Sequence, residues 1–234
     1  MFQNTSGNDD HQEGGPITMK TLIAVPCMDT VSTSFAKSLV NLRKGEDCEA
    51  QFVQSSLVYD SRNRLAGYAI DGNFDAVLWL DSDMIFPADL LEKLSAHLES
   101  GKDIVSGLCF CRRFPFGPVV YKRLELEDEK PINDSYFDYP EDRIFRVEGC
   151  GFGVVMTKTD MLREIVKKYK TLFSPLPNFG EDLSFCIRAR ECGYEIWCDP
   201  TIPIGHVGYI NVNERIYKSV RNIQKKEKEQ NHGE

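Results

Sequence analysis

The chain has 234 residues, of which 41% are hydrophobic and 27% charged, and these values are ordinary for a globular protein with one sizeable core. Its formal net charge of −8 argues against general nucleic-acid binding, which requires clustered Lys and Arg side chains. No apolar stretch reaches the roughly 18 residues of a membrane-spanning helix, so no transmembrane segment is expected.

Eight cysteines are spread along the chain, at positions 27, 48, 109, 111, 150, 186, 192 and 198. The spacing of Cys109-x-Cys111 does not match common zinc sites. The first twenty residues contain no apolar run of signal-peptide length. We therefore expect eight reduced thiols in a cytoplasmic protein.

The composition changes at residue 19. Residues 1–18 are polar, rich in Gly, Asn and Asp, and without periodicity, which predicts a disordered leader. We expect one domain over residues 19–212 and a charged helical tail over residues 213–234. No internal repeat is present.

Strands and helices are predicted to alternate through the first half of the domain. The apolar run over residues 21–25 ends at Pro26 and predicts a buried strand. The expected elements that follow are a helix over 32–43, a strand over 51–56, a helix over 61–71, a strand over 76–80, a helix from Pro87 to about residue 100 and a strand over 104–110. This alternation is typical of a parallel α/β sheet.

The second half of the domain is less regular. Residues 112–146 mix Pro, aromatic and acidic residues and predict an excursion over the sheet face. We expect Tyr136, Phe137 and Tyr139 to pack this excursion onto the sheet, with a platform for a sugar ring as the alternative. Arg112-Arg113 is expected to be a solvated turn, with a contact to a donor phosphate or an acidic acceptor as the alternative. The later elements are a strand over 154–156, helices over 160–170 and 181–192, and a strand over 194–198.

Two aspartates follow directly after the strand over 76–80, in the order Asp81-Ser82-Asp83. In an open α/β sheet, ligands bind outside the carboxyl ends of the strands. Carboxylate oxygens there suit a hard divalent cation that bridges the protein to substrate phosphates. The competing interpretation is a strand-to-helix turn in which the aspartates only cap backbone N–H groups.

Several segments together resemble the family-2-like glycosyltransferases of the GT-A fold. They are Val25-Pro26-Cys27-Met28-Asp29, Ser61-Arg62-Asn63, Leu78-Trp79-Leu80-Asp81-Ser82-Asp83, Gly149-Cys150-Gly151-Phe152-Gly153 and Gly180-Glu181-Asp182. The resemblance covers roughly residues 20–206 and rests on the order and spacing of these motifs. It implies a Rossmann-like, mostly parallel central sheet flanked by helices.

The resemblance also implies a site for a nucleotide-diphosphate-sugar donor, a UDP- or GDP-sugar. Its donor-binding residues would be Pro26, Asp29, Arg62, Asn63, Asp81 and Ser82. For Arg62 the alternative is a solvated position on a helix. A metal ion, Mn²⁺ or Mg²⁺, would be held by Asp83 with Asp81 and His206, and an imidazole ligand favours Mn²⁺. For His206 the alternative is a loop histidine with a local hydrogen bond.

The resemblance also implies that the pair Glu181-Asp182 is catalytic. Asp182 would be the general base that deprotonates the acceptor hydroxyl, with Glu181 orienting it. The alternative is that both carboxylates only stabilise the N-terminus of a helix through its dipole.

The function that these residues predict is a hexosyltransferase-like enzyme that transfers a single sugar, with inversion favoured over retention. The Gln-x-x-Arg-Trp motif of polymerising members is absent. The alternatives are a catalytically inactive nucleotide-sugar-binding module and a sugar-phosphate nucleotidyltransferase. The nucleotidyltransferase is disfavoured because Pro26-Cys-Met-Asp29-Thr, after the first strand, contains no Gly-rich loop. The acceptor, whether a sugar, a protein or a small molecule, stays open.

Overall fold

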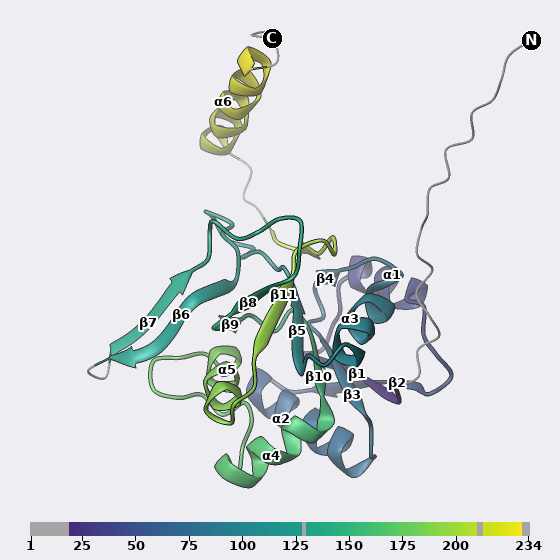
Figure 1. Cartoon of the computed structure of the whole chain (residues 1–234). Helices are drawn as coiled ribbons and strands as arrows, with labels where there is room; N and C mark the ends of the chain where they lie inside the picture. The colour runs from purple at the N-terminus through teal and green to yellow at the C-terminus, as the bar shows by residue number, and fades with distance from the viewer. Residues whose placement is uncertain (1–18, 128–129, 210–212, 231–234) are drawn as a thin grey trace, which may run out of the picture.

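A computed structural model describes residues 19–127, 130–209 and 213–230, so the predicted leader over residues 1–18 lies outside the described residues. The centre of the structure is a seven-stranded sheet with the order β2-β1-β3-β10-β5-β11-β8 (Figure 1). Its strands are β1 (Thr21–Cys27), β2 (Cys48–Gln54), β3 (Ala76–Leu80), β5 (Ile104–Gly107), β8 (Phe145–Val147), β10 (Val154–Lys158) and β11 (Ile196–Asp199).

Most of these strands run in one direction. β1 is parallel to both β2 and β3, and β5 is parallel to β11. β10 lies antiparallel between β3 and β5, and β8 is antiparallel to β11 at the edge of the sheet. The expected mostly parallel α/β sheet is therefore confirmed, and the carboxyl ends of β1, β3 and β5 lie along the same edge.

Helices cover both faces of the sheet (Figure 1). They are α1 (Thr33–Asn41), α2 (Val58–Asp71), α3 (Leu90–Glu99), α4 (Thr159–Tyr169) and α5 (Glu181–Glu191), with α6 (Glu214–Gln230) near the C-terminus. Residues of α2, α4 and α5 belong to the same buried cluster as Trp79, whereas residues of α1 and α3 belong to the cluster of Leu78. Neighbouring residues of a strand point to opposite faces, so β3 contributes to both cores and is apolar along its whole length.

The predicted excursion over residues 112–146 contains more regular structure than expected. β6 (Val120–Glu127) and β7 (Lys130–Ser135) form an antiparallel hairpin, and β9 (Gly149–Cys150) joins β6 to complete a three-stranded sheet. The periodicity of this segment was weak because the hairpin is largely exposed, so little apolar alternation marks its strands.

The three aromatic residues after β7 do not share one environment. The rings of Tyr136 and Tyr139 lie 5.3 and 6.0 Å from the buried ring of Phe145, as the packing interpretation expects. Phe137 instead is 68% exposed. The packing interpretation therefore applies to the two tyrosines and is wrong for Phe137.

A second pairing is important for the site. β4 (Met84–Ile85) pairs antiparallel with β12 (Gly205–His206), and the amide of Val207 donates to the carbonyl of Asp83 over 2.9 Å. Residues separated by more than a hundred positions thus lie side by side. All eight cysteines are free. Within the described residues, no helix combines the length and the apolar character needed to cross a membrane.

Candidate functional site

A cleft of about 510 Å³ opens where β1 and β3 end. Every site residue expected from the sequence lines it except Asn63 and Asp182. Those that do are Pro26, Asp29, Arg62, Asp81, Ser82, Asp83, Glu181 and His206. The tertiary structure thus brings together side chains from the first, middle and last parts of the domain.

Arg62 forms the floor of the cleft. Its side chain, on α2, is only 2% exposed. Nη1 donates to Glu181 Oε1 and Nη2 donates to Asp81 Oδ1, each over 2.7 Å. The guanidinium also lies over the rings of Phe152 and Phe173, which is a cation–π arrangement. The alternative of a solvated helix position is therefore wrong for Arg62.

The buried charges of Arg62, Asp81 and Glu181 shift the pKa values of Arg62 and Asp81. Burial alone would lower the pKa of Arg62, but the charges of Asp81 and Glu181 raise that pKa above its ordinary value. Burial raises the pKa of Asp81, and the ion pair with Arg62 offsets only part of this effect. Removal of either carboxylate would leave part of a buried positive charge uncompensated.

Asp83 and His206 meet through the pairing of β4 with β12. His206 Nε2 lies 3.4 Å from Asp83 Oδ2, and His206 Nδ1 lies 2.8 Å from the carbonyl oxygen of Phe110. Arg112 Nη1 donates to the same oxygen of Asp83. Partial burial favours the neutral acid, but the hydrogen bond from His206 and the charge of Arg112 lower the pKa of Asp83 overall. The bond to Asp83 raises the pKa of His206.

These donors fit a divalent cation in part. The carbonyl oxygen of Phe110 can only accept a hydrogen bond, so Nδ1 of His206 must carry the proton. In the neutral imidazole the lone pair of Nε2 then faces Asp83. Asp81 Oδ1, in contrast, is bonded to Arg62. Among the residues that the structure describes, no three His, Cys, Asp or Glu side chains are gathered in an arrangement that could hold a metal ion. Asp83 and His206 therefore form a two-ligand set that substrate oxygens would have to complete.

Asp182 lies beside the cleft rather than in its lining. Its Oδ1 accepts from the amide of Leu183 over 2.7 Å. Burial and the neighbouring charge of Glu181 raise the pKa of Asp182 to about 6, although Arg62 acts in the opposite direction. A β-carbon at Gly151 would lie 3.8 Å from Asp182 Oδ2 and only 2.7 Å from Val119, so a larger residue at position 151 would clash.

The expectation that Asn63 lines the donor pocket is wrong. Asn63 Oδ1 accepts from the amides of Leu172 and Phe173 over 3.1 and 3.0 Å. The hydroxyl of Thr171 donates to the same oxygen over 3.4 Å. On a helix, neighbouring side chains point in different directions, so Arg62 faces the cleft while Asn63 holds the loop that follows α4.

The structure adds a contact that the sequence did not predict, the ion pair of Arg112 with Asp83. The residue belongs to a hairpin over residues 109–119, closed by bonds from Cys111 N to Gly117 O and from Val119 N to Cys109 O, both over 2.9 Å. This hairpin places Arg112 on Asp83. The only local signal was the Arg112-Arg113 pair, which is equally common in solvated turns.

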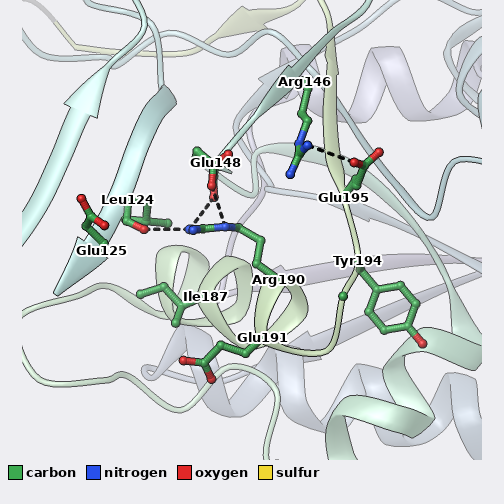
Figure 2. A pocket seen from close by; sticks show the side chains of 10 residues that line it. Leu124, Glu125, Arg146, Glu148, Ile187, Arg190, Glu191, Tyr194 and Glu195 are labelled. Atoms are coloured by element: carbon green, nitrogen blue, oxygen red, sulfur yellow. Dashed lines mark hydrogen bonds and ion pairs between the residues drawn. The ribbon is translucent and has the colours of Figure 1, made fainter.

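A second hollow, of about 560 Å³, lies between β6, β8, the end of α5 and residues 193–195. Figure 2 shows that its arginines point at protein acceptors: Arg190 at Glu148 and the carbonyl of Leu124, and Arg146 at Glu195. Its cations are thus already paired, and it contains none of the expected site residues.

Comparison with known proteins was informative only at the level of structure. No family model matches the chain, and no curated protein matches it in sequence. The chain is similar to the crystal structure of A197 from STIV, with a TM-score of 0.59 and 22% identity over 82% of this chain and 87% of that one.

The chain is also similar to GalNAc-T7, whose structure contains UDP, GalNAc and Mn²⁺, with a TM-score of 0.61 and 8% identity. That match covers 82% of this chain but 44% of GalNAc-T7, so the chain spans less than half the length of that protein. At such identities the similarity shows the fold alone. The fold is the GT-A fold expected from the sequence motifs.

Proposed function

We propose that this protein is a metal-dependent glycosyltransferase that moves one sugar from a UDP- or GDP-sugar to an acceptor hydroxyl. The observation that carries the proposal is the convergence of Arg62, Asp81, Asp83, Glu181 and His206 on one cleft at the carboxyl ends of β1 and β3. In open α/β sheets this is where nucleotides bind. The GT-A fold, shared with a protein whose structure contains UDP and Mn²⁺, supports it.

The donor would lie across the ends of β1 and β3. Pro26 and Asp29, which follow the apolar part of β1, would contact the base and ribose. Asp81 and Ser82 would contact the ribose and the diphosphate from the other side. Arg62 would act mainly as a positioning residue, because both of its terminal nitrogens are already bonded to carboxylates.

A Mn²⁺ or Mg²⁺ ion would be held by Asp83 and His206, with Asp81 close by and diphosphate oxygens completing the coordination. Such an ion neutralises the charge that develops on the diphosphate leaving group. Arg112 forms an ion pair with the Asp83 carboxylate. Its guanidinium would be within reach of a donor phosphate at this position, since Arg suits phosphate oxygens.

Asp182 would be the general base. A pKa of about 6 leaves its carboxylate ionised at neutral pH and still basic enough to accept a proton. The acceptor oxygen would form its bond to the anomeric carbon while its proton moves to Asp182. The bond from that carbon to the phosphate oxygen would break, with its electron pair leaving on the nucleoside diphosphate. This direct displacement inverts the configuration. Glu181, held by Arg62, would orient the start of α5.

An inactive nucleotide-sugar-binding module is the second candidate, because the same cleft would bind a donor without turnover. The enzyme is the first candidate because the pKa of Asp182, which burial and the charge of Glu181 raise to about 6, suits a general base. A nucleotidyltransferase is disfavoured because the segment after β1, from Cys27 to Thr30, contains no glycine.

The test measures thermal unfolding with UDP-, GDP- and dTDP-sugars, each with Mn²⁺ and with EDTA. A donor at about 100 times its dissociation constant adds about 2.7 kcal/mol to the free energy of unfolding. For a chain of this size the melting temperature rises by about 5–10 °C. We expect a rise for one nucleotide class, lost with EDTA and in Asp83→Ala but kept in the exposed control Asp142→Ala.

Release of the nucleoside diphosphate is measured on the same samples. Donor binding without release, in the presence of a broad acceptor panel, would favour the binding module. No shift with any donor, with or without metal, would refute the proposed function.

A further inference from the structure

Helix α6 presents an apolar face that is largely exposed. Ile216, Tyr217, Val220 and Ile223 recur at the spacing of one helical face. The side chains of Tyr217, Val220 and Ile223 are between 47% and 59% exposed. Figure 1 shows α6 standing apart from the sheet and from the helices that cover it. An apolar face of this kind is stable in water only when it meets another surface.

The charge of α6 indicates which surface that is. The seventeen residues of α6, Glu214–Gln230, contain six Lys or Arg and three Glu, whereas the whole chain has a net charge of −8. On a helical projection, Arg221 lies beside the apolar face and Lys218 lies opposite to it. A short helix with an apolar stripe and a basic polar face suits an anionic lipid–water interface.

A second apolar surface lies on the hairpin over residues 109–119. Phe114 and Phe116 at its tip are exposed, Phe114 by 75%, and their ring centroids are 6.0 Å apart. The ring of Phe137 lies over Gly117 beside them, because a β-carbon there would come within 3.2 Å of it. Phe116 has a φ of +59°, an unfavourable value for a bulky residue that is retained mainly at functional positions. The three rings expose on the order of 300 Å², enough to mark an interaction site.

The chain itself connects the two apolar surfaces. The backbone of Gly208 passes over the base of the hairpin, where a β-carbon would lie 3.0 Å from Arg112 Cβ. Tyr209 follows and is fully exposed. α6 begins at Glu214, five residues after Tyr209, so its start lies within about 18 Å of that residue. The hairpin contributes Arg112 to the lining of the cleft, and α6 begins a short stretch of chain after the residue that passes over this hairpin.

We propose that α6 and the aromatic tip of this hairpin dock together on an anionic membrane surface. α6 would lie in the plane of the headgroups with its apolar face toward the acyl chains, and Phe114 and Phe116 would insert beside it. Arg113, which directly precedes Phe114 in sequence, would meet lipid phosphates. The cleft would then open toward the membrane. That the acceptor is a membrane-borne molecule rests in addition on the proposed transferase function, whereas lipid docking does not.

The test is co-sedimentation of the full chain with vesicles of phosphatidylcholine alone and of equal parts phosphatidylcholine and phosphatidylglycerol. We expect binding to the anionic vesicles, weakened by salt. Ile223→Glu removes an aliphatic side chain that the acyl chains would cover when α6 docks, and it adds a negative charge. Binding of the protein to anionic vesicles should therefore fall by about tenfold or more. Phe114→Ser should reduce it in the same direction.

Val40→Glu is the matched control. Val40 is 82% exposed on α1, and it belongs neither to α6 nor to the hairpin over residues 109–119. This variant should bind vesicles as the wild type does. Circular dichroism verifies that every variant is folded.

Equal binding of Ile223→Glu and Val40→Glu, or no binding of the wild type to anionic vesicles, would overturn the proposal. So would a wild-type dimer that Ile223→Glu converts to monomers without any vesicle binding, because α6 would then be covered by a second copy. Thermal shifts with nucleotide sugars on the same samples keep the two proposals separate: a chain that docks on lipid but binds no donor refutes only the proposed function.

Discussion

Arg62 Nη1 lies 2.7 Å from Glu181 Oε1, although 119 residues separate the two along the chain. The contact joins α2, which follows the second strand, to the first turn of α5. The same guanidinium holds Asp81 at the end of β3. The buried guanidinium of Arg62 thus links the segment expected to bind the donor to the segment expected to bear the general base.

Arg62→Met should lower the free energy of unfolding by about 3 kcal/mol, because it leaves Asp81 and Glu181 as unpaired, partly buried carboxylates. Urea unfolding followed by circular dichroism measures the change. Arg64→Met, on the exposed side of the same helix, should change it by less than about 0.5 kcal/mol. Similar losses in the two variants would mean that the buried ion pair contributes little.

Asn63→Ala should destabilise the protein without weakening donor binding. It removes the acceptor of two backbone amides, those of Leu172 and Phe173, and each unsatisfied amide costs about 1–3 kcal/mol. The melting temperature of the free protein should therefore fall, while the rise produced by donor and Mn²⁺ should stay the same. A smaller rise of the melting temperature with donor and Mn²⁺ would indicate that Asn63 contacts the donor. Asn41→Ala, at the exposed end of α1, is the control.

Transfer should depend on pH through Asp182. The pKa of its carboxyl is raised to about 6, so kcat/KM should fall as the pH drops below 6 and the base becomes protonated. A profile that stays flat between pH 5 and about 8 would exclude Asp182 as the base. Asp182→Asn should abolish transfer and retain donor binding.

The stability of the same variant gives an independent check. A folded-state pKa above the unfolded value means that Asp182 contributes stability at low pH, which is lost as the pH rises through about 6. Asp182→Asn should therefore be more stable than the wild type at pH 8, by no more than about 3 kcal/mol, and the difference should shrink toward pH 4. Urea unfolding at the two pH values measures it.

Arg112→Ala should separate metal binding from catalysis. Without its partner, Asp83 is freed for a cation, so Mn²⁺ should bind the donor-free protein about threefold more tightly, as expected for a partly exposed ion pair. Loss of a charged contact to the donor phosphate should lower kcat/KM by about tenfold. Calorimetry and initial rates measure the two effects, and Arg113→Ala is the matched control. Weaker Mn²⁺ binding in Arg112→Ala would contradict the expected competition between Arg112 and Mn²⁺ for the Asp83 carboxylate.

The local pattern was sufficient to predict the apolar strands and the residues that follow them. Residues 21–25 and 76–80 are continuous apolar runs because both faces of the sheet are covered, and the structure contains strands there. Since β1 and β3 are parallel neighbours, the polar residues after each of them had to meet at one edge. The resemblance implied that Asp29 and Asp81 both contact the donor, and both residues line the cleft.

The hairpin of β6 and β7 and the role of Arg112 were not predictable in this way. The hairpin joins neighbouring segments whose exposed strands show little apolar alternation, and the contact of Arg112 with Asp83 joins residues 29 positions apart, so neither is marked by a periodic signal. Asn63 was misplaced for a related reason, since its partners, residues 171–173, lie more than a hundred positions away.

By itself, the sequence determined the mostly parallel α/β class, the ends of the strands that bear polar residues, and the charged helical tail near the C-terminus. These features depend on side-chain periodicity within short segments, which local chemistry dictates. Only the tertiary structure decided that Arg62 is buried between Asp81 and Glu181, that His206 faces Asp83, and that Asn63 supports a loop. Each of these contacts joins residues that the chain keeps apart, so it exists only after the sheet and its covering helices have packed.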